Sequence, residues 1–408
     1  MLFLGIDWSD DSLDYFLQDK DKKELVQGSV KPDFSGMADL FSVLETHAEP
    51  VEIGVAIETC HGAWVQAFLD RGYPVYPVNP AMADSFRKSL SANGEKTDKI
   101  DAYVLSRYLH TFSDRMHPLR PDDPEVVSLR IACQDRVRLV QERTAKLNEL
   151  GAIIKCHYPA FLGLFADFNS AIAMDFLRDF PTQNAMRKLS EKKLRTWLKR
   201  AGYTCPGRVD EMVAMLKAPV LKVADHLQDA KAPLITFLAA SIEILNREIK
   251  SMDDQINDQM DNLPEAKWAR SLPGAGDVLA PALLACVGRD TKRFTSVAQA
   301  RALMGTAPVT FTSGKKKTCT KTIHFRRGCW KFARRTLHLF ADESRRFCSW
   351  AAEFYKRYRD SGHRHHESLR ALAHKWLKII LTMQRTGKPY DESIFINSRK
   401  KHLSKSAL

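Results

Sequence analysis

Six apolar residues recur in the second half of the chain at alternating steps of four and three: Leu238, Ile242, Leu245, Ile249, Met252 and Ile256. This spacing puts them on one stripe of an α-helix, as in a coiled-coil seam. A similar repeat runs from Val126 to Ile154. Both repeats predict long helices, and the one that contains Leu238 is expected over about 232–263. They leave open whether the seams pair within one chain or between copies.

The first hundred residues have a different pattern. Short segments rich in β-formers at 2–8, 13–19 and 24–31 are broken by polar turns and predict three strands. The run V-E-I-G-V-A-I-E at 51–58 is continuously apolar and ends in an acid, which is typical of a buried central strand. With a further strand at 73–80 and helices between the strands, the segment predicts a mixed sheet flanked by helices.

These patterns predict an α/β domain followed by mostly α structure, in three parts. Residues 1–115 would form the sheet domain, residues 116–265 a helical, coiled-coil linker and oligomerisation region, and residues 266–408 a mostly helical domain. The last part includes a basic helix over roughly 328–350.

Charge is unevenly distributed along the chain. The net charge is +13, yet residues 301–408 carry 25 Lys and Arg against 7 Asp and Glu, so the first 300 residues have a net charge of −5. This asymmetry predicts a polyanionic partner for the C-terminal part, of which nucleic acid is the leading candidate. A solvated basic face, or binding to acidic protein or membrane, is the alternative.

No apolar run approaches the roughly 20 residues that span a bilayer. The eight cysteines form no C-x-x-C pair, which argues against structural zinc and fits a reducing compartment. The sequence therefore predicts a cytoplasmic protein.

Four acids near the N-terminus are candidate metal ligands: Asp7, Glu58, Asp98 and Asp101. Asp7 and Glu58 end predicted strands, and Asp98 and Asp101 are three residues apart, hence neighbours on one helix face. Carboxylates gathered by a fold bind Mg²⁺ or Mn²⁺, which can hold a phosphate. Each acid alone is more often a turn or cap residue, and nearby acids, Asp14 among them, compete with Asp7 for the assignment.

Ser313 lies in the basic loop T-F-T-S-G-K-K-K (310–317). A serine hydroxyl needs activation, which metal coordination of the phosphate and nearby cations can supply. The cations expected to contact nucleic acid are Lys315, Lys316, Lys317, Lys321, Arg326, Arg327, Lys331, Arg334 and Arg335. A serine in such a loop is otherwise an ordinary turn residue.

The turn L-P-G-A-G-D (272–277) is similar to the hairpin of helix-hairpin-helix modules. There, glycines at the positions of Gly274 and Gly276 let backbone N–H groups approach a phosphate at a helix start. A plain turn between two helices is the competing interpretation.

Taken together, the chain resembles the transposases of insertion-sequence family one-hundred-ten. The resemblance rests on G-I-D-W (5–8), I-E-T (57–59), K-T-D-K-I-D-A (96–102), L-P-G-A-G (272–276), S-G-K-K-K (313–317) and R-R-G (326–328). It implies a RuvC/RNase H-like domain with Asp7, Glu58, Asp98 and Asp101 as its DEDD metal ligands. It also implies a C-terminal transposase domain with Ser313 as nucleophile.

By the same resemblance, the protein would be a bridge-RNA-guided serine recombinase of a bacterial insertion sequence, acting at the nucleoid. Its partners would be donor DNA, target DNA, a non-coding bridge RNA and other copies of the chain, as a dimer or tetramer. Two alternatives remain: a RuvC-like junction nuclease that uses water, and an inactive repressor that only binds nucleic acid.

Overall fold

The computed structural model describes residues 1–59, 62–90, 98–120, 122–313, 320–326 and 328–394. Side chains are described for these residues except Asp98, Pro206, residues 311–313, residues 320–323 and Phe325. Contacts divide the chain into two compact units, Met1–Asp122 and a second that begins at Asp123.

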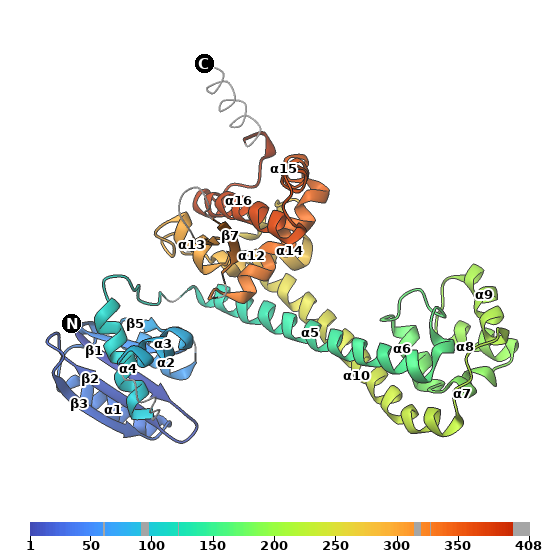
Figure 1. Cartoon of the computed structure of the whole chain (residues 1–408), viewed down its shortest axis with the longest axis horizontal. Coiled ribbons are helices and arrows are strands. Elements are labelled where there is room, and N and C mark those ends of the chain that lie inside the picture. The colour runs from blue at the N-terminus through green and yellow to red at the C-terminus, as the bar shows by residue number, and fades with distance from the viewer. Residues whose placement is uncertain (60–61, 91–97, 121, 314–319, 327, 395–408) are drawn as a thin grey trace, which may run out of the picture. The chain divides into compact units, whose positions relative to one another are not determined.

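The first unit is built on a five-stranded sheet in the order β3-β2-β1-β4-β5 (Figure 1). β1, β2 and β3 form an antiparallel meander, whereas β4 runs parallel to both β1 and β5. The strands are β1 (Leu2–Trp8), β2 (Leu13–Gln18), β3 (Glu24–Val30), β4 (Ile53–Ile57) and β5 (Val75–Pro77). The predicted mixed sheet is confirmed.

β4 is apolar throughout because helices cover both faces of the sheet. Ile53, Val55 and Ile57 pack into a core shared with Leu40 of α1, whereas Ala56 packs on the opposite face. The helices of this unit are α1 (Phe34–Glu45), α2 (Ala63–Asp70), α3 (Pro80–Leu90) and α4 (Asp98–Phe112).

The second unit is organised along two long helices, α5 (Pro124–His157) and α10 (Asp225–Asp261), which lie against each other (Figure 1). The predicted stripe is the contact face: Ile242, Leu245 and Ile249 are buried. Arg136 of α5 pairs with Asp253 of α10 across the contact. Pairing within one chain is therefore present. α10 starts earlier than the expected residue 232 because the helix continues through Pro233.

Four short helices, connected to α5 and α10, enclose a core of their own. They are α6 (Ala171–Asp179), α7 (Gln183–Arg187), α8 (Glu191–Arg200) and α9 (Pro206–Lys217). This core contains Phe176 and Trp197 together with Leu150 of α5 and Leu238 of α10. The other ends of the two long helices enter a different core, through Cys133 and Met260.

That second core belongs to the C-terminal helices. They are α11 (Ala266–Arg270), α12 (Gly276–Val287), α13 (Val297–Leu303), α14 (Lys331–Phe347), α15 (Ser349–Asp360) and α16 (His365–Thr386). Trp268, Phe340 and Trp376 are its largest fully buried side chains. The basic helix expected over roughly 328–350 is confirmed as α14, which ends at Phe347, whereas α15 was not expected. The structure has two helices that break at Cys348, whose backbone is extended with φ −135°.

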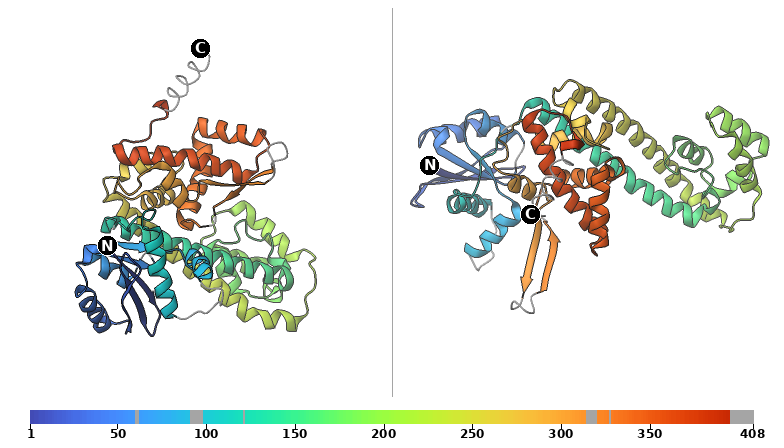
Figure 2. Two further views of the ribbon diagram at one scale, coloured as in Figure 1. Left: turned by 60° about the vertical axis from the view of Figure 1, so that its left-hand side comes forward. Right: turned by 90° about the horizontal axis from the view of Figure 1, so that it is seen from above.

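Two strands interrupt the helices of this part. β6 (Pro308–Ser313) and β7 (Thr320–Phe325) form an antiparallel pair. Figure 2 shows this pair standing out from the helices of its unit. Within the described ranges, no helix is long and apolar enough to cross a membrane.

Candidate functional site

Asp7 and Glu58 come together at one end of the sheet. β1 and β4 are parallel neighbours, and Ile6 is the register partner of Ile57. The residue after each of these is an acid, so Asp7 and Glu58 lie at neighbouring positions at the same end of the two strands. The carboxyl ends of parallel strands meet at one edge, which is where ligands of α/β sheets bind. The predicted convergence of these two acids therefore has a geometric basis.

The alternation of side chains assigns both acids to the face covered by α4. Leu4 and Ile6 pack into the core on the opposite face, whereas Phe3 packs with Leu105 of α4. Successive side chains of a strand point to opposite faces. Asp7 therefore shares the α4 face with Phe3, and Glu58 shares it with Ala56.

Gly5 permits a close approach between β1 and α4. A Cβ atom at Gly5 would lie 2.0 Å from the carbonyl oxygen of Ala102. One helical turn further on, the Ser106 hydroxyl donates a 2.7 Å hydrogen bond to the Phe3 carbonyl. The helix therefore runs antiparallel to the strand, and a step of four residues along α4 matches a step of two residues along β1.

The same register extends to the acids of α4. Four helix residues advance about 6 Å and two strand residues about 6.6 Å. Continuing from the pair Ala102 and Gly5, the backbone of Asp98 reaches the level of Asp7. Asp98 opens α4, and Asp101 follows one turn later. The backbone thus brings all four predicted acids to one end of the sheet.

Asp101 already has a cationic partner. Its carboxylate lies 2.9 Å from the guanidinium of Arg87 on α3, and Arg87 also pairs with Asp84. Sequence reasoning missed Arg87, since nothing in S-F-R-K-S (85–89) distinguishes it from a surface cation. The negative charge at this end of the sheet is therefore partly balanced from within the unit.

A further acid lies beside Asp7. Asp14 on β2 is its direct register partner across the antiparallel pair, and Asp14 is only 6% exposed. The Ser12 hydroxyl donates to its carboxylate at 3.1 Å. Directly opposed residues of an antiparallel pair share a face. Asp14 thus adds negative charge next to Asp7. The Asp-Asp pairing could have been found from the hairpin register.

These acids match the donor chemistry of a hard divalent cation, which prefers carboxylate oxygens. Among the described side chains, no group of three or more His, Cys, Asp or Glu is arranged to hold a metal ion. The Asp98 side chain is outside that description. The donor set fits Mg²⁺ or Mn²⁺ in type, and Asp7, Glu58, Asp98 and Asp101 would hold it.

Ser313 is the last residue of β6, where its backbone pairs with Thr320. The expectation of a loop at 310–313 was wrong, since T-F-T-S is paired along its length with β7. The Ser313 side chain is not described. Of the neighbouring cations, Lys315, Lys316, Lys317 and Arg327 lie outside the described residues, and Lys321 is described only as backbone of β7.

The cations of α14 have different surroundings. Lys331 is exposed at the start of the helix and Arg335 is half-buried. Arg334 is held inward: its guanidinium donates a 3.1 Å hydrogen bond to the Arg326 carbonyl, and its stem lies against Gly305. Arg334 therefore has a structural role in closing the segment after β7, apart from any contact with nucleic acid.

The turn before α12 is also explained by packing. Gly274 has φ +78°, and a Cβ there would lie 2.8 Å from the Phe347 ring and 3.2 Å from the Glu343 backbone. The last turn of α14 therefore requires Gly274. Gly276 has φ +52° with open space around its Cβ position. Contact with a phosphate at either glycine stays a prediction.

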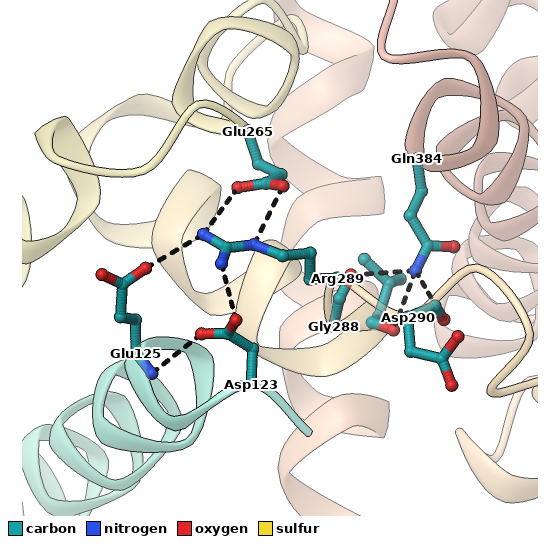
Figure 3. A network of polar contacts seen from close by, with 8 residues as sticks. Asp123, Glu125, Glu265, Gly288, Arg289, Asp290 and Gln384 are labelled. Carbon is teal, nitrogen blue, oxygen red and sulfur yellow. Dashed lines mark hydrogen bonds and ion pairs between the residues drawn. The ribbon is translucent and has the colours of Figure 1, made fainter. Parts of the chain in front are cut away.

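An ion-pair network that sequence reasoning missed anchors the start of the second unit (Figure 3). Arg289, just after α12, reaches Asp123 at 2.7 Å, Glu125 at 3.1 Å and Glu265 at 3.1 Å. Beside it, the Gln384 amide of α16 donates to the Gly288 carbonyl at 2.8 Å. The network ties the N-terminus of α5 to the C-terminal helices.

Comparison with known sequences finds two transposase families, one that matches the N-terminal part of the chain and one that matches the C-terminal part. A family described as "Transposase", named for a DEDD motif, matches residues 4–159. A family described as "Transposase IS116/IS110/IS902 family" matches residues 266–356.

Individual relatives cover most of the chain. The mini-circle putative transposase for IS117 of Streptomyces coelicolor is 26% identical over 77% of this chain and 78% of its own length. The 42 kDa protein of insertion element IS900 from Mycobacterium paratuberculosis is 25% identical over 91% and 92%. The 44.8 kDa protein of IS116 from Streptomyces clavuligerus is 26% identical over 85% and 86%.

Proposed function

The chain belongs to the IS110/IS116/IS902 family of transposases, and from this premise we propose that it cuts and rejoins DNA through a covalent bond to Ser313. The observation that carries the proposal is the register at the sheet end. Asp7, Glu58 and the start of α4 are brought to one edge by the β1–β4 pairing and the Gly5–Ala102 contact. The acids would hold phosphate and metal, and the serine would supply the nucleophile.

In the covalent step, Ser313 Oγ attacks a DNA phosphorus and loses its proton. The bond from phosphorus to the 3′ oxygen breaks, and that oxygen leaves as a 3′-OH after taking up a proton. The 5′ end stays attached as a phosphoserine. A 3′-OH from the other DNA then attacks the phosphoserine and restores the serine. The number of phosphoester bonds is conserved, so no ATP is required.

The carboxylates and cations have separate tasks in this scheme. When bound, a divalent ion stabilises the negative charge of the phosphate and of the leaving oxygen. Asp7, Glu58, Asp98 and Asp101 orient that ion at the sheet end. Lys331 and Arg335 would neutralise backbone phosphates near the serine.

The proposal also includes the partners of the protein, which are RNA, DNA and other copies of the chain. A bridge RNA would pair with donor and target DNA, and the basic C-terminal part would hold these strands. Two or four copies would assemble, and the α5–α10 pair would form part of the contact between copies. Exposed Phe237 and Ile244 on α10, seven residues apart, are consistent with a further contact along this pair.

A covalent-adduct assay tests the proposal. The protein, expressed with RNA from the flanking DNA, is mixed with labelled element-junction DNA and Mg²⁺, then run on a denaturing gel. We expect a protein-linked DNA band for the wild type and for Thr312→Ala, which removes the neighbouring hydroxyl. Ser313→Ala should lose the band and keep DNA binding.

The other outcomes separate the alternatives. Cleavage without a linked band would mean that water attacks, as in a metal nuclease; the location of all four acids in the first unit is compatible with that activity. DNA binding without any cleavage, unchanged by Ser313→Ala and by removal of metal, would identify a repressor. Either result overturns the serine mechanism.

A further inference from the structure

A second concentration of positive charge lies on the short helices, far in sequence from the basic C-terminal part. Residues 187–200 contain seven Lys and Arg and one acid, although the first 300 residues are net negative. Within this segment, Lys188, Lys192, Lys193 and Lys199 are exposed. Lys188 is the C-cap residue of α7 and the other three lie on α8; we name these four residues together the α8 basic face.

The lysines of the α8 basic face point away from the protein. Leu194, Trp197 and Leu198 form the buried side of α8. Lys192 and Lys199 are seven residues apart and lie on the opposite side of the helix. Among the described residues, no acid pairs with any of the four lysines, whereas Arg195 and Arg200 of the same helix pair with Asp210 and Asp179.

Two of these lysines occupy unfavourable positions for the helix itself. Lys192 and Lys193 are in the first turn of α8, next to the partial positive charge of the helix N-terminus. A cation there destabilises a helix, by a few tenths of a kcal/mol up to about 1 kcal/mol. Helix stability therefore accounts for Lys199 in the last turn but not for Lys192 and Lys193.

We propose that the α8 basic face binds the phosphate backbone of a DNA duplex. Lys192 and Lys199 are about 10 Å apart along the helix axis. That distance lies between the widths of the two grooves of B-DNA, about 6 Å and 12 Å, whose edges the phosphates line. Such contacts position a duplex without reading its sequence.

The surface favours a duplex over a single strand. Single-strand binding relies on exposed aromatic side chains that stack on bases. The one aromatic residue of α8, Trp197, is buried, and its indole N–H donates to Asp179 at 2.6 Å. Because the chain belongs to a transposase family, we take DNA as the duplex that binds here. Binding at the α8 basic face requires neither the metal site nor Ser313.

The α8 basic face is separate from the C-terminal cations. α5 enters the C-terminal core at Cys133 and the core of the short helices at Leu150. Seventeen residues of helix advance about 25 Å. A duplex held at the α8 basic face is therefore a contact additional to those made by α14.

Salt-dependent DNA binding tests the proposal. The full chain is titrated against a fluorescent duplex of several helical turns, in EDTA, at several KCl concentrations. A variant with Lys192→Gln, Lys193→Gln and Lys199→Gln is compared with a control carrying Lys155→Gln, Lys222→Gln and Lys250→Gln, three exposed lysines outside the α8 basic face. Both variants lose the same charge.

We expect the α8 variant to lower the slope of log affinity against log salt by about 2 to 3, and to bind roughly tenfold more weakly. Its melting temperature should equal or exceed that of the wild type, which excludes unfolding as the cause. Equal slopes for the two variants would overturn the proposal, as would a loss seen with structured RNA but not with duplex DNA. Because EDTA prevents metal chemistry, this result is independent of the adduct assay.

Discussion

The guanidinium of Arg87 lies 2.9 Å from the carboxylate of Asp101 and joins α3 to the first turns of α4. Both side chains are 18% exposed, so water screens the pair only in part. Asp101 is one of the four proposed metal ligands. A metal ion that takes Asp101 as a ligand must therefore compete with Arg87.

Arg87→Gln should strengthen metal binding. Removing the cation frees Asp101 and lowers the positive potential at the sheet end, so we expect Mn²⁺ to bind several-fold more tightly, corresponding to roughly 1 kcal/mol. Mn²⁺ titration followed by electron paramagnetic resonance measures this on the full chain. Lys88→Gln is the matched control, because Lys88 pairs with Asp84 at 2.7 Å and not with Asp101. Weaker Mn²⁺ binding by Arg87→Gln than by the control would contradict the competition.

Gly5→Ala should disrupt the contact that aligns α4 with β1. The added methyl would lie 2.0 Å from the backbone oxygen of Ala102, and a backbone atom cannot move aside as a flexible side chain can. We expect a loss of about 3 kcal/mol or more in unfolding free energy of the first unit. Thermal unfolding measures the change. Gly151→Ala is the control: it lies inside α5 with its nearest contact at 4.0 Å, and should be neutral or stabilising.

Arg289→Met should loosen the anchor at the start of α5. It leaves Asp123 and Glu265 without their shared cation, and these carboxylates are only 32% and 17% exposed. We expect a destabilisation of about 1–3 kcal/mol. Chemical denaturation measures it, with Arg138→Met as control, since Arg138 pairs with Asp135 on the open surface and should contribute almost nothing. Equal effects of the two substitutions would argue against the network.

Acid should destabilise the C-terminal helices through His338. Burial, with help from neighbouring His366, Arg370 and His365, lowers the pKa of His338 from 6.5 to about 4, while Asp342 opposes the shift. Between these two values the unfolded chain binds the proton more readily. The contribution of neutral His338 to the free energy of unfolding is thus fully present above pH 6.5 and is lost as the pH falls toward 4.

His338→Gln measures that contribution. The melting temperature of the wild type should fall more between pH 7.5 and pH 5 than that of the variant, because glutamine takes up no proton. His47→Gln, on the first unit, serves as control. If wild type and His338→Gln have parallel pH profiles, the coupling of His338 to folding is excluded.

Much of the secondary structure follows from local patterns. The segments 2–8, 13–19 and 24–31 were expected as strands and are β1, β2 and β3. The four-three spacing from Leu238 to Ile256 was expected to form one face of a helix and is the contact of α10 with α5. Both patterns repeat within a few residues, since a helix or strand buries its apolar side chains at a fixed period.

The strand at Ser313 had no comparable signal. P-V-T-F-T-S is too short and too polar to distinguish a strand from a loop, and β6 exists only because β7 pairs with it. The break at Cys348 was equally hidden, since A-D-E-S-R-R-F-C-S-W-A-A carries no Gly or Pro to end a helix. Packing in the C-terminal core decides that break.

The amino-acid order thus determines the acids, the strand that carries Asp7, the strand that precedes Glu58, and the helix that begins at Asp98, because each depends on neighbours in the chain. Tertiary structure decides which groups meet: Asp14 across from Asp7, Arg87 on Asp101, and Ala102 against Gly5. These encounters depend on strand register and helix packing, which are set by contacts between residues far apart in sequence. No local period encodes such contacts, and so they became visible only in the folded chain.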